Sequence, residues 1–217
     1  YIFSRKIFRK NHKMKRKFFS ENALVGYNGF VGSNLLPDIK KKNKKLKLYN
    51  SKNIHKIKSK SFDKIFFAAL PATKWLANKY PSKDLKIINS IKSKFKNVRC
   101  KLFILISTID IHNDIETYGR NRKNFEKFII NNLKKYLIIR LPAVFGKGLK
   151  KNILFDLLNK NNIEKINFEN EYQWFDLSLL YKEISILIKK NNNVISELYS
   201  KPIKSTEIKK FFPDIEF

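Results

Sequence analysis

The chain has 217 residues and a formal charge of +29, with 40 lysines and 7 arginines. Its length suits one large domain, or a nucleotide-binding domain with a small appendage. A single cysteine, Cys100, excludes an internal disulfide, and the three scattered histidines do not have the spacing of a metal site. The longest uninterrupted apolar stretch has eight residues, 65–72, far fewer than the ~20 of a membrane-spanning helix. We therefore expect a cytoplasmic protein without a bound metal.

The high positive charge has two explanations. A dedicated basic surface would suit nucleic acid or another polyanion. However, Lys, Asn, Ile, Phe and Tyr, which A/T-rich codons encode, are all abundant. Nucleic-acid binders often favour arginine for bidentate contacts, and arginine is scarce here. Codon bias is thus the simpler explanation, and nucleic acid is the less favoured partner.

Residues 1–20 carry eight Lys or Arg, no acid and four phenylalanines. A transit-like or membrane-surface helix has such a composition. Because the chain opens on Tyr1 rather than Met, we favour a basic, disordered extension that precedes the folded part.

From residue 22 onward, apolar segments alternate with stretches of helical period, a pattern typical of an α/β fold with a doubly wound parallel sheet. Pro37 falls inside the first expected helix, which should kink or break there. The predicted strands are Ala23–Val25, Leu46–Tyr49, Lys64–Ala69, Leu102–Ile106 and Leu137–Arg140.

Three glycines, Gly26, Gly29 and Gly32, follow the first predicted strand at three-residue spacing. Glycine lets the backbone turn tightly and approach a diphosphate, and the amides at the start of the next helix attract the anion. An ordinary strand-to-helix turn would also use glycine. The spacing alone leaves both interpretations open.

The flanks of this loop, Gly-x-x-Gly-Phe-Val-Gly over 26–32, resemble the nucleotide-binding loop of the extended short-chain dehydrogenase/reductases, the NAD-dependent epimerase/dehydratase family. The resemblance implies a Rossmann-like NAD(P)-binding domain over 21–142 and a reduced substrate lobe over 143–217. It also implies that one group of residues holds the cofactor: Gly26, Asn28, Gly29, Phe30, Val31 and Gly32.

The second predicted strand ends at Asn50-Ser51-Lys52, without the acid that folds preferring NAD place about twenty residues beyond the glycine loop. An uncharged tip followed by lysine favours NADP, although Asn50 could also bind a plain ribose. The next segment, 62–71, resembles the family's fourth strand. That resemblance places Ala68, Ala69 and Leu70 beside the cofactor.

Residues 101–111 resemble the strand that delivers a catalytic Ser or Thr, with Thr108 as the best match and Ser107 as the alternative. Tyr118 and Arg122 resemble the family's Tyr-x-x-x-Lys signature, with arginine in place of lysine. Residues four apart share one face of a helix, so the two side chains should point together. The resemblance implies that Tyr118 moves the substrate proton, that Arg122 supplies a cation beside the phenol and the cofactor, and that Thr108 donates a hydrogen bond to the reacting oxygen.

Two departures bear on this site. Arginine is longer and planar, so its exchange for lysine is not conservative. The interval from Thr108 to Tyr118 is also only ten residues, shorter than in typical extended members. Tyr118 could therefore be an aromatic residue at a helix start without a chemical role.

Residues 137–148 resemble the segment that leads from the nucleotide domain to the sugar-nucleotide pocket, with the backbone near Pro142 facing the nicotinamide. Ala143 stands where many relatives have a substrate-contacting asparagine. Trp174 could stack on a base or sugar, or lie in a core.

The resemblance implies an NAD(P)-dependent enzyme that epimerises, dehydrates or reduces a nucleotide sugar, and it allows a homodimer. The alternative is a non-catalytic protein that keeps this fold and binds RNA or another polyanion through its basic surface.

Overall fold

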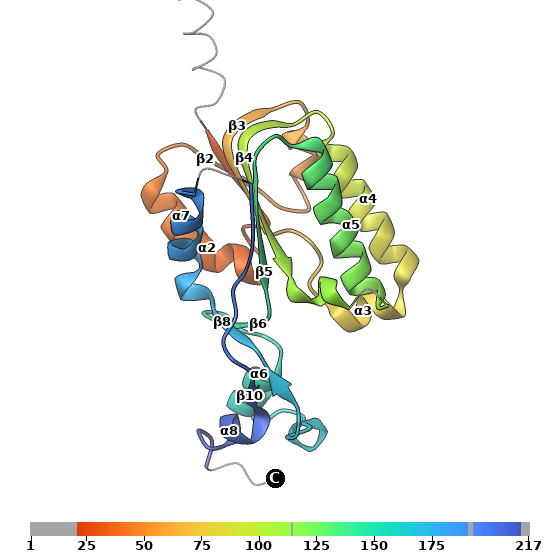
Figure 1. Cartoon of the computed structure of the whole chain (residues 1–217), viewed down its shortest axis with the longest axis vertical. Helices are drawn as coiled ribbons and strands as arrows, with labels where there is room; N and C mark the ends of the chain where they lie inside the picture. Colours follow the sequence, from red (N-terminus) through yellow and green to blue (C-terminus); the bar gives the residue numbers. More distant parts are fainter. Residues whose placement is uncertain (1–20, 114, 191–192, 214–217) are drawn as a thin grey trace, which may run out of the picture.

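A six-stranded parallel sheet forms the centre of the computed structural model, which describes residues 21–113, 115–190 and 193–213 (Figure 1). The strand order is β2-β1-β3-β4-β5-β9. These strands are β1 (Asn22–Val25), β2 (Leu46–Tyr49), β3 (Ser61–Phe67), β4 (Arg99–Thr108), β5 (Tyr136–Leu141) and β9 (Val194–Glu197). The predicted doubly wound α/β class is confirmed. The predicted basic segment 1–20 lies outside the described residues.

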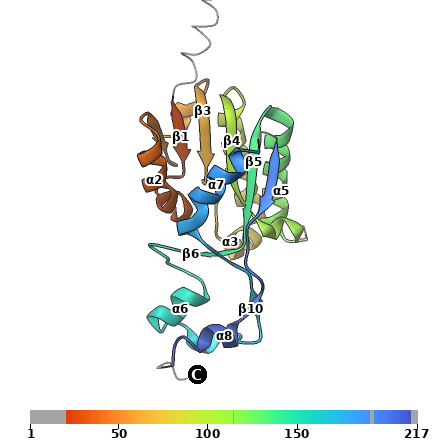
Figure 2. The same ribbon diagram turned by 60° about the vertical axis from the view of Figure 1, so that its left-hand side comes forward.

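Helices cover both faces of the sheet (Figures 1 and 2). One face is covered by α2 (Phe30–Lys42) and α7 (Leu180–Ile188), and the other by α4 (Pro81–Phe95) and α5 (Thr117–Asn132). Shorter elements are α3 (Lys74–Lys79) and the 3₁₀ turns η1 (Ile54–Ile57), η2 (Ile109–His112), η3 (Ile163–Lys165) and η4 (Leu177–Leu179).

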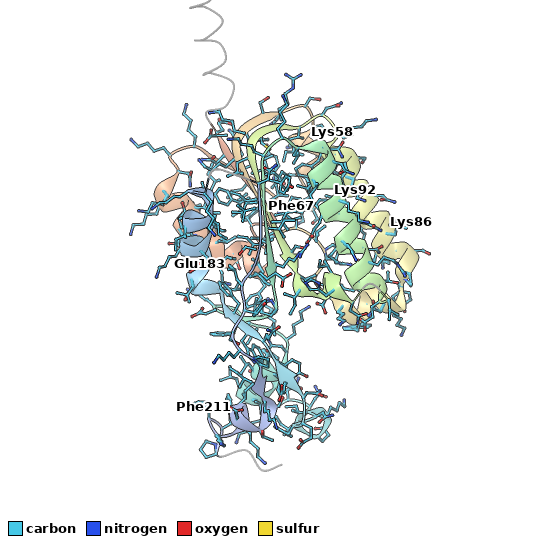
Figure 3. All side chains as sticks on the ribbon, viewed as in Figure 1. Lys58, Phe67, Lys86, Lys92, Glu183 and Phe211 are labelled. Atoms are coloured by element: carbon cyan, nitrogen blue, oxygen red, sulfur yellow. The ribbon has the colours of Figure 1, made fainter. Side chains whose placement is uncertain are left out.

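The central strands are buried on both faces, as expected for a parallel sheet between helices. Phe67 at the end of β3 illustrates this packing (Figure 3). Its ring stacks on Phe103 and Phe125, at 5.6 and 5.3 Å between ring centroids, and meets Phe95 edge-on. One aromatic cluster therefore joins β3 and β4 to α4 and α5.

The connection from β2 to β3 contains only η1 and crosses β1 to the other side of the sheet. The strand order therefore reverses between β1 and β3, and this is the switch point of the sheet. Two strands, β2 and β1, lie on one side of it, whereas the six-stranded Rossmann order has three there. Ligands of open α/β sheets bind outside the carboxyl ends of the strands at such a switch point. The site is thus expected between the ends of β1 and β3.

Pro37 does not break α2, which continues from Phe30 to Lys42. Proline removes one helical hydrogen bond. Pro37 lies on the exposed side of the helix, while Leu35 and Ile39 bury the opposite side in the core. Packing of that apolar face keeps the helix continuous.

A small lobe lies beyond the carboxyl ends of the strands (Figures 1 and 2). Its elements are β6 (Ala143–Phe145), α6 (Ile153–Asn159), β7 (Glu171–Tyr172), β8 (Trp174–Asp176), β10 (Ile203–Lys204) and α8 (Ser205–Lys209). Leu157, Trp174 and Ile208 form its core. The chain over 143–217 serves both parts, because α7 and β9 return to the main sheet. Among the described residues, no helix is long and apolar enough to cross a membrane.

Candidate functional site

The glycine loop between β1 and α2 lies directly against the end of β3. Gly26 has a φ of +88°, and a Cβ there would stand 2.3 Å from the Ala68 carbonyl oxygen. A Cβ on Gly32 would stand 2.0 Å from the Gly26 carbonyl oxygen. Both glycines are therefore required for the loop to fold between β3 and the first turn of α2.

The start of α2 offers open backbone amides to an anion. The amides of Phe30, Val31 and Gly32 open the helix, where intrahelical acceptors are absent. Its N-cap, Gly29, brings no side-chain cap, and the first turn has no acid. The helix dipole adds positive potential at this end. The Phe30 and Val31 side chains pack into the core while Asn28 is exposed, so the arrangement fits a diphosphate.

We expect Gly26→Ala to destabilise the fold far more than Gly148→Ala. Gly148 also has a positive φ, +80°, but a Cβ there meets nothing within 4 Å. Both variants lose about 1–2 kcal/mol to the left-handed conformation, and only Gly26→Ala adds overpacking, at about 1–3 kcal/mol. Thermal unfolding of the two variants tests this difference. Equal melting temperatures would contradict the tight packing of the loop on β3.

The end of β2 is organised by Asn50. Its side-chain amide donates to the Tyr27 hydroxyl at 3.1 Å, and its side-chain oxygen accepts from the Lys52 amide at 3.0 Å. Ser51 and Lys52 are exposed at this tip. The Asn50 side chain therefore joins the tip of β2 to the glycine loop. Lys52 places an exposed positive charge at this tip.

The alanine pair follows β3, which ends at Phe67 rather than at Ala69 as predicted. The Ala68 amide donates to the Val25 carbonyl at 2.9 Å, which continues the pairing with β1 beyond the strand. Ala69 and Leu70 pack against the core under α4 and α5. The Ala68 carbonyl thus faces the bend at Gly26.

Ser107 and Thr108, at the end of β4, have different surroundings. The Ser107 hydroxyl donates to Glu126 Oε1 at 2.5 Å, and Arg140 binds the same carboxylate at 2.8 Å through Nη2. This network is buried behind the strand. Thr108 Oγ1 donates to Asp110 Oδ2 at 2.8 Å and accepts from the Asp110 amide at 3.1 Å. Both hydroxyls therefore have a carboxylate partner within the protein, and both residues are 9% exposed.

Tyr118 and Arg122 share one face of α5, as their spacing predicts. The guanidinium carbon of Arg122 lies 3.9 Å from the centroid of the Tyr118 ring. The cation thus covers the ring face rather than the phenolic oxygen. Burial raises the pKa of the Tyr118 phenol, and the opposing charge of Arg122 does not compensate for it.

Arg122 is 1% exposed and held by a buried ion pair. Its Nη1 and Nη2 donate to the two carboxylate oxygens of Asp84 at 2.7 and 3.0 Å, and Nη2 also donates to the Pro71 carbonyl at 2.5 Å. Asn121 donates to Asp84 at 2.8 Å. The guanidinium therefore joins α4, α5 and the loop after β3. It is not exposed toward a cofactor, contrary to the expectation from the signature.

Lys74, which was not predicted from the sequence, is linked to Thr108 through Asp110, and its charge acts on Tyr118. Its Nζ lies 2.9 Å from Asp110 Oδ1 and 2.9 Å from Glu116 Oε2. Burial disfavours its charged form, but these carboxylates outweigh burial and raise the pKa of Lys74. Asn78, also on α3, accepts from the Tyr118 amide at 2.9 Å. One signal was available: a lysine seven residues after the carboxyl end of the central strand β3.

Hydrogen bonds of Asn34 and Lys151 join the lobe to the main part of the molecule. The Asn34 side chain on α2 accepts from the Lys147 amide at 3.1 Å and donates to the Lys147 carbonyl at 3.0 Å. Lys151 donates to the Ala72 carbonyl at 2.7 Å.

Pro142 separates β5 from β6. Trp174 lies in the lobe core, 6% exposed, opposite Ala143.

Within residues 21–113, 115–190 and 193–213, no group of three or more His, Cys, Asp or Glu could hold a metal. Four groups converge at the carboxyl ends of the strands. They are the glycine loop, the alanine pair, Thr108, and the ion-pair cluster of Lys74 with Asp110 and Glu116. They lie at the edge where open α/β sheets bind their ligands, next to the switch point between β1 and β3.

No family model matches the sequence, and no curated protein matches it. Among solved structures, the chain is similar to UDP-N-acetylglucosamine 4-epimerase from Methanobrevibacter ruminantium M1 in complex with UDP-N-acetylmuramic acid (TM-score 0.71, 15% identity, 90% of this chain and 82% of that chain). It is also similar to dTDP-4-dehydrorhamnose reductase from Clostridium acetobutylicum ATCC 824 (0.72, 14%, 90% and 82%). A third similar structure is TunA, an NAD-dependent NDP-hexosamine 5,6-dehydratase of tunicamycin biosynthesis (0.76, 11%, 91% and 82%). The fold is therefore that of nucleotide-sugar epimerases, dehydratases and reductases.

Proposed function

We propose that this protein is an NAD(P)-dependent enzyme that acts on a nucleotide sugar by epimerisation, dehydration or reduction. The observation that carries the proposal is the glycine loop, with Gly26 against Ala68 and open amides at the start of α2. The likeness of the fold to nucleotide-sugar enzymes over nine-tenths of the chain supports it.

The bound nicotinamide would accept or supply the hydride. The loop from Gly26 to Gly32 would hold the diphosphate, and Ala68, Ala69 and Leu70 would line the path toward the backbone at Pro142. Asn50 and Ser51 would lie near the ribose. Lys52 would favour the 2′-phosphate of NADP, since the tip of β2 has no acid to repel it.

Tyr118 would move the proton of the substrate hydroxyl, and Thr108 would donate to the reacting oxygen. A free tyrosine titrates near ~10, so a nearby cation must favour the phenolate at neutral pH. Arg122 orders the ring but is paired with Asp84. We assign a second, weaker contribution to Lys74, which is itself paired with Asp110 and Glu116: burial raises the pKa of Tyr118 most, and the charges of Arg122 and, to a smaller extent, Lys74 lower it.

Coenzyme binding tests the proposal. NADPH fluorescence should rise on addition of the protein, with tighter binding than NADH, and Lys52→Glu should reverse that preference because it places a carboxylate beside the 2′-phosphate. UDP-glucose, UDP-N-acetylglucosamine and dTDP-4-dehydrorhamnose are the first substrates to assay with the coenzyme. Absence of binding to either coenzyme would refute the enzyme proposal.

Lys74→Met should lower turnover at pH 8 by about tenfold or more, because the phenolate of Tyr118 loses a favourable charge. The pKa of Tyr118 then rises, so the increase of turnover with pH moves to more alkaline values. Lys74→Arg keeps the charge and should retain the original profile. NADPH affinity is the control, and it should not change. An unaltered pH profile in Lys74→Met would remove Lys74 from the mechanism.

A further inference from the structure

The amino-terminal edge of the sheet concentrates positive charge. In a parallel sheet all strands begin at one edge, and the helices that cover it end there. Each of the five turns that enter β2, β3, β4, β5 and β9 carries exposed cations, and all of these are lysines except Arg99. They are Lys40, Lys41, Lys42, Lys44, Lys45, Lys58, Lys60, Lys96, Arg99, Lys134, Lys135, Lys189 and Lys190.

Acids at this edge are few and already paired. Glu21 lies 3.8 Å from Lys47 Nζ, and Asp63 lies 2.9 Å from Lys64 Nζ and 2.8 Å from Lys101 Nζ. The lobe at the other end of the molecule is different, because lysines and acids alternate there. Its acids are Asp156, Glu164, Glu169, Glu171, Asp176 and Glu207.

Neither codon bias nor helix dipoles account for this distribution. Codon bias raises the lysine content of the whole surface and does not remove acids from one edge. Helix dipoles favour a cation in the last turn of an α-helix, which covers Lys40 to Lys42. They do not cover Lys58 and Lys60, which follow a 3₁₀ turn, or Arg99, which lies in a strand.

The dimensions and composition of the edge indicate the kind of partner. Six strands about 4.8 Å apart span ~24 Å, and this matches about seven base pairs of duplex. Among the residues that the structure describes, none of the exposed large apolar side chains lies in the five turns, so these residues offer no ring for stacking on bases and no wedge for a membrane. Lysines bind phosphates as point charges and do not read bases as arginines do.

We propose that the amino-terminal edge of the sheet binds the phosphate backbone of double-stranded nucleic acid without sequence preference. The edge lies at the end of the molecule opposite the lobe, as Lys58 and Phe211 show (Figure 3). Duplex binding is therefore separate from the coenzyme site, and either can fail without the other.

Two variants with equal net charge test the proposal on the full chain. The edge variant carries Lys44→Gln, Lys60→Gln, Lys96→Gln, Lys134→Gln and Lys190→Gln, one change in each turn. The control variant carries Lys83→Gln, Lys86→Gln, Lys127→Gln, Lys160→Gln and Lys201→Gln, all exposed and outside the edge. Each is titrated with a fluorescent 20-base-pair duplex at several salt concentrations, and NADPH binding is measured in parallel.

Binding is expected to weaken with salt. The slope of log K against log salt should be shallower in the edge variant by up to about 4.5, at ~0.9 for each of five lost phosphate contacts. The control variant should keep the original slope, and NADPH affinity should be the same in all three proteins. Equal losses in both variants would show a simple effect of net charge and overturn the proposal. So would the absence of duplex binding at 50 mM salt, or binding to phosphatidylserine vesicles but not to the duplex.

Discussion

Tyr118→Phe is expected to lower turnover of the nucleotide-sugar substrate by about 10²–10⁴-fold, the usual contribution of a positioned acid/base group. The variant removes one oxygen and leaves the ring, so the contact with Arg122 at 3.9 Å should remain. NADPH affinity and thermal stability should therefore stay close to those of the unaltered protein. Single-turnover measurements at saturating coenzyme isolate the effect on the chemical step.

Thr108→Val is the matched companion, since it removes the hydroxyl that contacts Asp110 and keeps the side-chain shape. A loss of turnover in Tyr118→Phe without a loss in Thr108→Val would assign the proton transfer to the phenol and leave the threonine with a structural role. Full turnover by Tyr118→Phe would refute the assignment of the phenol.

Asp84→Asn is expected to reduce the free energy of unfolding by about 3–5 kcal/mol, because it leaves the buried guanidinium of Arg122 without its counter-charge. The side chains of Arg122 and Asp84 are only 2% and 4% exposed, so water cannot replace the lost partner. Chemical denaturation measures the change. Asn89→Asp, on the exposed side of the same helix, serves as a control and should have little effect.

The double variant Asp84→Leu with Arg122→Met separates the charge from the packing. Replacing both members of a buried pair with apolar side chains is often neutral for stability. We therefore expect recovery of most of the stability lost in Asp84→Asn, together with a less ordered Tyr118 and reduced turnover. If the double variant were as unstable as Asp84→Asn, loss of the hydrogen bonds rather than the unpaired charge would be the cause.

Local sequence patterns were enough to predict the sheet and the glycine loop. Strand segments such as Leu102–Ile106 are continuous apolar runs, and the three glycines mark the tight bend by their spacing. The spacing of Tyr118 and Arg122 likewise predicted that they share a face, since helix geometry depends only on nearby residues.

The surroundings of those residues depend on contacts between distant segments. Asp84 precedes Arg122 by 38 residues, and their pairing follows from the packing of α4 on α5. Lys74 meets Asp110 because α3 and η2 both pack against α5. The short connection from β2 to β3 has no distinctive composition. Local sequence patterns therefore could not predict that only two strands, β2 and β1, lie on that side of the switch point.

The double hydrogen bond between Asn34 and the backbone of Lys147 has a mechanical consequence. It fixes the first residues after β6 to α2, the helix whose start would hold the diphosphate. Gly146 lies so close to Asn34 that a Cβ there would stand 2.9 Å from Asn34 Oδ1. A second attachment follows at Lys151, which donates to the Ala72 carbonyl, and Gly148 lies between the two, with a φ of +80° and open space around it. A movement of the lobe over a ligand would therefore either bend the chain at Gly148 or release one of these hydrogen bonds.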